Sequence, residues 1–69
     1  MYSRLSYSDV EARLSRERAR LLSRLRLGDK DLVVSDFDEL FALKRELLVR
    51  EGLDPSGVYE WFVSEFQFQ

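Results

Sequence analysis

Three charged side chains fall where a helical reading of the sequence expects apolar ones, and they are the first candidates for chemistry. Arg18 and Lys44 each lie within a run of leucines spaced for the buried face of a helix, and Glu65 lies among aromatic residues. A buried charge without a partner is costly, so these side chains either extend their charged ends to solvent or pair with one another. The ion pair that we would test first joins Glu65 to Arg18 or to Lys44 across two helices. We do not expect the trio to be catalytic.

The other residue types exclude most classes of enzyme. The chain has no cysteine and no histidine, which excludes disulfides, thiolate nucleophiles and Cys/His zinc sites and removes the usual general base. A carboxylate pair could still do acid–base work, but three glycines and one proline are few for the loops that normally carry a catalytic pocket. We therefore expect no enzymatic activity, no catalytic residue, no metal, no cofactor and no evident small-molecule site.

The composition is that of one small folded domain spanning residues 1–69. Hydrophobic residues make up 45% of the chain and charged residues 35%, which is too apolar for disorder and too charged for a bilayer. Because no apolar run is longer than four residues, we expect neither a membrane span nor a signal peptide, and we expect a cytoplasmic location. A core of this size rarely supplies more than about 3–5 kcal/mol. We therefore expect self-association, most simply as a homodimer.

Start and stop signals predict an all-α domain of three helices, roughly at residues 8–27, 36–51 and 55–66, packing as a homo-oligomer. Leucines and aromatic residues recur at helical spacing within each range. Gly28 and Gly52 follow the first two ranges, where glycine typically adopts the left-handed conformation that ends a helix. Short connections between the ranges predict one compact bundle.

Polar residues before each range predict where the helices begin. Ser8 and Glu11 have the spacing of a capping box, in which each side chain bonds the backbone N–H of the other residue. Ser35 opens a similar acidic first turn. Asp54 followed by Pro55 predicts a capped start for the third helix, because proline fits the first helical position.

The segment Leu32-Val33-Val34 between the first two helices is the one stretch with the composition of a strand. It is either a loop that fills part of the core or a short strand that pairs across a dimer. We favour the loop.

The third helix carries an unusually wide apolar face. At 100° per residue its apolar side chains cover about 200°, whereas a helix that faces a single core needs a stripe only a little wider than 100°. The helix is therefore either wedged between the other two or exposes a second apolar face. An exposed face of this kind usually marks a protein-binding surface. Its candidate contact residues are Tyr59, Trp61, Phe62 and Phe66.

Charge is divided unevenly along the chain. Residues 1–28 hold seven arginines against three acids, and residues 29–69 hold four basic residues against ten acids, so that +4 and −6 give the net charge of −2. Four arginines of the first helix form a stripe that faces phosphate, an acidic protein surface or only solvent: Arg13, Arg16, Arg20 and Arg24. The chain as a whole is acidic, with a pI near 5.0, whereas nucleic-acid-binding domains are typically basic.

Residues 44–63 resemble a helix-turn-helix in their spacing, with Gly52 at the turn and apolar Leu53 after it. However, Leu48 stands where a small residue is usual, and the helix after the turn carries no positive charge to attract DNA. We therefore favour a protein-interaction or regulatory module of the accessory, inhibitor or assembly-factor type. It would bind a protein partner or itself through the aromatic third helix and the arginine stripe. The alternative is a dimeric DNA-binding transcriptional regulator with a degenerate helix-turn-helix at 44–63.

Overall fold

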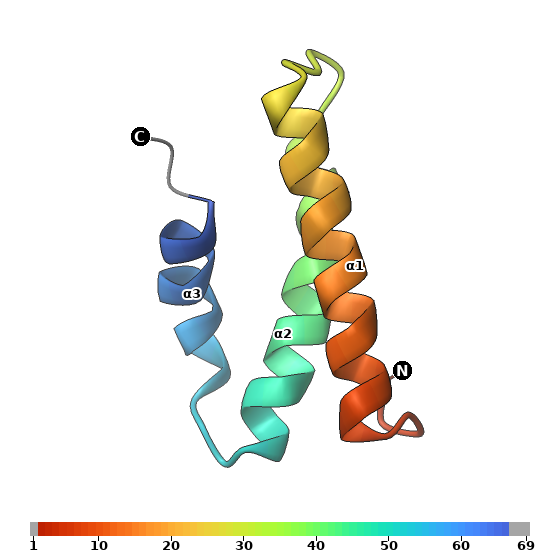
Figure 1. Cartoon of the computed structure of the whole chain (residues 1–69). Helices are drawn as coiled ribbons and strands as arrows, with labels where there is room; N and C mark the ends of the chain where they lie inside the picture. The colour runs from red at the N-terminus through yellow and green to blue at the C-terminus, as the bar shows by residue number, and fades with distance from the viewer. Residues whose placement is uncertain (1, 67–69) are drawn as a thin grey trace.

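Three α-helices form the molecule, as the sequence predicts. The structure is a computed structural model that describes residues 2–66 (Figure 1). Its elements are α1 (Tyr7–Arg26), the 3-10 helix η1 (Val34–Phe37), α2 (Asp38–Arg50), the 3-10 helix η2 (Pro55–Gly57) and α3 (Val58–Glu65). No strand forms among the described residues, and Val34 begins η1.

Both long helices end in the same hydrogen-bonded motif around a left-handed glycine. Gly28 has φ +70° and Gly52 has φ +75°. After α1 the N–H of Asp29 donates to the carbonyl of Arg24 at 3.1 Å, and after α2 the N–H of Leu53 donates to the carbonyl of Leu48 at 2.9 Å. These long-reach bonds satisfy carbonyls that the helix ends would otherwise leave unpaired. Both predicted stop signals are confirmed.

The predicted start of the first helix is wrong by one residue, and its cap is a different serine. The hydroxyl of Ser6, not that of Ser8, accepts the backbone N–H of Asp9 at 3.1 Å. The earlier start includes Tyr7 in α1, and its hydroxyl donates to Glu51 at 2.7 Å across the hairpin. That hydrogen bond raises the pKa of Tyr7 above its ordinary value, because it favours the protonated hydroxyl. Ser6 and Ser8 offer similar capping signals, and the start that uses Ser6 is accompanied by the contact between Tyr7 and Glu51.

The other two starts lie close to the predicted ones but begin with a tighter turn. Asp36 accepts the N–H of Val33 at 2.7 Å and closes η1, after which α2 runs from Asp38. Asp54 accepts the N–H of Ser56 at 2.9 Å, with Pro55 in the first position of η2, so the capped start is observed. A 3-10 turn is common at the beginning of an α-helix.

The two long helices form a hairpin, and α3 turns back along α2 (Figure 1) near enough to α1 for Arg18 and Glu65 to pair. The core consists of leucines and a valine from both long helices together with one aromatic residue, Phe66, at the end of α3. At about 1.5 Å per residue, the eight residues of α3 are less than half as long as the twenty of α1. α3 therefore covers only part of the hairpin, and the end that carries the α1–α2 connection, which we call the tip, extends beyond it.

Alanine substitutions at two glycines are expected to change the free energy of unfolding in opposite directions. Gly52→Ala is expected to cost about 1–2 kcal/mol, because an L-residue is strained at the φ of +75° although its Cβ meets nothing within 4 Å. Gly57→Ala is expected to stabilise the protein by about 0.4–1 kcal/mol, because Gly57 has φ −60° and a Cβ there would make an ordinary contact, 3.9 Å from Leu48 Cδ1. Urea unfolding followed by far-UV circular dichroism measures both, and equal changes in the two variants would contradict the assignment.

Candidate functional site

Most of the aromatic side chains proposed as a contact surface turn into the molecule. Phe66 is 6% exposed and belongs to the core, while Trp61 and Phe62 are half-buried against it. Tyr59, at 59% exposure, is the one member of the set that faces solvent, and Val63 is exposed beside it. The wedge alternative thus accounts for most of the wide apolar face, and a narrower strip remains outside.

The inward aromatic rings join α3 to the start of α2. Phe37 meets Phe62 edge to face, with ring centroids 5.4 Å apart, and meets Phe66 in the same way at 5.8 Å. Phe41 lies 4.9 Å from Phe62 and 6.0 Å from Tyr59. Such pairs each contribute about 0.5–1.5 kcal/mol beyond the area that they bury. The cluster holds α3 in place and leaves some of its ring faces open on one side.

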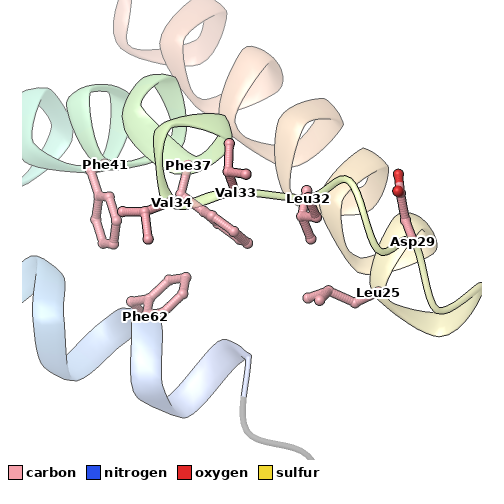
Figure 2. Close-up of a pocket in the computed structure, with 8 residues that line it drawn as sticks. All are labelled: Leu25, Asp29, Leu32, Val33, Val34, Phe37, Phe41 and Phe62. Carbon is pink, nitrogen blue, oxygen red and sulfur yellow. The ribbon is translucent and has the colours of Figure 1, made fainter.

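An apolar groove of about 410 Å³ opens beside this cluster, between the tip and the end of α3 (Figure 2). We call it the tip groove. Seven of its eight lining residues are apolar, and they come from α1, the connection, η1, α2 and α3. They are Leu25, Asp29, Leu32, Val33, Val34, Phe37, Phe41 and Phe62. Within residues 2–66, α3 ends before it reaches the tip, and the groove lies beyond that end.

Sequence reasoning missed the tip groove, although one signal for it was present. The connection was expected to fill the core with its apolar residues, but only Leu32 packs against the core. Val33 is 56% exposed and Val34 is 83% exposed at the rim of the groove. Consecutive β-branched residues in a connection between helices cannot all face inward, so their number could have indicated an exposed apolar edge.

A second apolar surface adjoins the groove on the outer side of α3. Tyr59 and Val63, one helical turn apart, line a shallow hollow together with Glu60. We call these two exposed side chains the α3 ridge. Because the ring of Tyr59 lies beside that of Phe41, which also lines the groove, the α3 ridge and the tip groove meet at this aromatic pair.

The predicted arginine stripe is largely paired within the chain. Three of its four guanidinium groups lie within 4 Å of a carboxylate, on α1 itself, on the connection or at the start of α2. The pairs are Arg13 with Glu39, Arg20 with Glu17, and Arg24 with both Asp29 and Asp36. Arg16 is exposed and has no such partner among residues 2–66. The stripe therefore presents much less net positive charge than the sequence of α1 alone indicates.

Arg24 holds the connection beside the tip groove. Its Nε donates to Asp29 at 2.7 Å, and its Nη1 lies 3.7 Å from Asp36. The hydrogen bond from Arg24, with a second from the backbone N–H of Asp31, lowers the pKa of Asp29 below its ordinary value. Ionised Asp29 therefore stabilises the folded protein at pH values above the pKa of an unfolded aspartate. This stabilisation is lost as the pH falls through the lowered pKa of Asp29.

The three charged residues at apolar helical positions line one crevice between α1, α2 and α3; they are Arg18, Lys44 and Glu65. Arg18 Nε is 2.5 Å from Glu65 Oε1, so an ion pair joins the two helices at the place where the sequence led us to test for one. Lys44 does not pair with Glu65; its Nζ lies 5.3 Å from the centre of the Trp61 ring, within the range of a cation–π contact. Because both partners of the ion pair are partly exposed, we expect it to contribute less than about 1 kcal/mol.

Within residues 2–66 no three acidic side chains converge as they would around a metal ion. In the same part of the chain no helix has the length and apolar composition needed to cross a bilayer. Protein-family models, curated proteins and solved structures gave no match to the chain. The tip groove, the α3 ridge and the charges around them are the candidate functional features of the described residues.

Proposed function

We propose that this chain is a small non-enzymatic protein-interaction module that binds its partner through the tip groove and the α3 ridge. The observation that carries the proposal is the pair of exposed valines, Val33 and Val34, on the rim of an apolar groove. Apolar side chains scattered singly over a surface are ordinary, whereas a contiguous patch in a small protein marks a contact surface. Here the exposed valines, the half-buried Phe62 and the exposed Tyr59 adjoin one another.

The tip groove suits a protein side chain better than a charged ligand. Apart from Asp29, which is already bonded to Arg24, its lining offers no side-chain charge. An aliphatic or aromatic side chain of a partner that entered between Phe41 and Leu25 would gain about 1.5–3 kcal/mol from burial. A few such anchors account for most of the affinity of a typical interface. A module of this type acts by occupying a surface of its partner, as an accessory protein, inhibitor or assembly factor does.

The paired arginines favour a protein partner over DNA. Phosphate binding by Arg13, Arg20 or Arg24 would require each of them to leave a carboxylate of its own chain. The exposed positions of α3 offer Tyr59, Glu60 and Val63, where a DNA-reading helix needs basic or amide side chains. We accordingly expect no binding to arbitrary duplex DNA at low salt in fluorescence anisotropy. Binding that weakens steeply as salt is added would support the DNA-binding alternative instead.

The valine rim gives the proposal a test with a matched control. Val34→Asp places a charge on the rim and is expected to abolish binding of the partner while leaving the fold intact, because Val34 is exposed and lies at a helix start that favours an acidic residue. Val49→Asp is the same change at another exposed valine, which does not line the groove. The readout is quantitative affinity capture from the cells that produce the chain, with thermal unfolding of each purified variant.

The proposal requires proteins that the wild type and Val49→Asp capture and that Val34→Asp does not. If Val34→Asp captured the same proteins as the wild type while remaining folded, the tip groove would not be the contact surface. If all three captured nothing above background, the chain would not be an interaction module under these conditions, and the proposal would fail.

A further inference from the structure

The tip groove and the α3 ridge are both apolar and lie on opposite sides of one aromatic pair. The ridge presents two exposed apolar side chains, Tyr59 and Val63, and the groove presents an apolar hollow with a valine rim. Phe41 and Phe62 lie between them, because Phe41 lines the groove on one side and meets Tyr59 on the other. One surface thus carries both the exposed apolar side chains of the ridge and an apolar groove.

We infer that a second copy of this chain occupies the tip groove, with the α3 ridge of each copy packed on the valine rim of the other. This inference rests on the proposed function and names the partner of the same surface. A two-fold axis close to Phe41 brings the ridge of one copy onto Val33 and Val34 of its partner, and by symmetry the reverse contact forms at the same time. The two-fold axis uses the same surface on both copies, so the contact gives a dimer and does not extend into a larger assembly.

Charge supports this orientation over the alternatives. Glu60 lies on the ridge side and is exposed, and among residues 2–66 no basic group lies within 4 Å of its carboxylate. Lys30 is exposed beside Asp29 at the groove and likewise has no acidic partner within that part of the chain. The proposed dimer pairs Glu60 of each copy with Lys30 of the other. Packing ridge against ridge would instead bring two Glu60 carboxylates together, which opposes association.

The incomplete cover over the hairpin gives a reason for self-association. Within residues 2–66, α3 does not reach the tip, and the apolar residues there are partly exposed. A chain of this size has little stability to spare, and burying apolar surface in a dimer stabilises the folded state by an amount that grows with the logarithm of protein concentration. Other copies of the chain are always present at the concentration of the protein itself.

Sedimentation of the purified full chain from micromolar to millimolar concentration tests the inference. The wild type is expected to reach twice its mass of 8.2 kDa as concentration rises. Val34→Asp and Val63→Asp are expected to remain monomeric, and Val49→Asp is expected to dimerise like the wild type. The wild type and the three variants must give the same far-UV circular dichroism spectrum at a concentration low enough for all of them to be monomeric.

A charge exchange tests the orientation. Glu60→Lys alone and Lys30→Glu alone are each expected to weaken dimerisation about fivefold or more, because each places two like pairs across the axis. Mixing the two single variants is expected to restore association, since a heterodimer of Glu60→Lys with Lys30→Glu has opposite charges at both contacts.

The possible outcomes separate this inference from the proposed function. A wild type that stays monomeric at millimolar concentration overturns the inference, while the function survives if capture still depends on Val34. A dimer that persists in both Val34→Asp and Val63→Asp also overturns it, because association would then use another surface. Failure of the mixed charge variants to associate better than either alone overturns the proposed orientation.

Discussion

Replacing Leu21 with alanine is expected to leave most of the protein unfolded at room temperature. Leu21 is fully buried in the C-terminal half of α1 and belongs to the core that joins α1 to α2. Truncating a buried leucine to alanine costs about 2–5 kcal/mol, the lost burial plus the cavity that remains. A core of this size supplies about 3–5 kcal/mol in total. Far-UV circular dichroism and urea unfolding at a fixed protein concentration measure the loss.

Leu27→Ala is the matched control for this prediction. Leu27 lies in the turn that ends the same helix and is 82% exposed, so the identical substitution is expected to change the free energy of unfolding by no more than about 0.5 kcal/mol. If Leu21→Ala and Leu27→Ala lowered the free energy of unfolding equally, the face of α1 that packs against α2 would be assigned incorrectly.

Phe66→Ala is expected to release α3 from the hairpin. Phe66 is the aromatic residue of the buried core, and its ring contacts Phe37 and Phe62. Removing a buried phenylalanine side chain costs about 3–5 kcal/mol. Trp61, half-buried on the same helix, reports the event, because its fluorescence emission shifts to longer wavelength as water reaches the indole. We expect this shift, a loss of helix signal and a lower urea midpoint.

Tyr59→Ala separates the two roles that the sequence assigned to the same helix. Its side chain is exposed, so the variant is expected to keep the stability and Trp61 emission of the wild type at low concentration while associating less strongly. If Phe66→Ala kept wild-type stability and lost only association, Phe66 would be a contact residue, as the sequence alone suggested, and not a core residue.

Signals carried by neighbouring residues were sufficient for much of the fold. Gly28 and Gly52 end their helices, and Asp54 caps the turn that leads into α3, because each of these effects depends on backbone geometry within a few residues. The start of α1 was not determined in this way. Ser6 and Ser8 both stand three residues before an acidic residue, and the observed start also allows the contact between Tyr7 and Glu51.

The surface was harder to predict than the helices, because a helical wheel shows which residues share a face but not what lies opposite that face. The wide apolar arc of α3 did not reveal that Phe66 would be buried and Tyr59 exposed. The sequence did not show that η1 and the start of α2 place Asp36 and Glu39 beside the arginine stripe. The contact between Arg18 and Glu65 was accessible to reasoning, since a charge inside an apolar arc needs a partner.

The anchoring of the α1–α2 connection has a consequence for the speed of association. Arg24 bonds one part of this segment, and Asp36 accepts the N–H of Val33 in another. Ordering a free backbone costs about 1–2 kcal/mol per residue, and a partner that had to order the connection would bind more slowly and less tightly. Here the valines are held in place before any encounter, so the partner that we propose would not have to order them on binding.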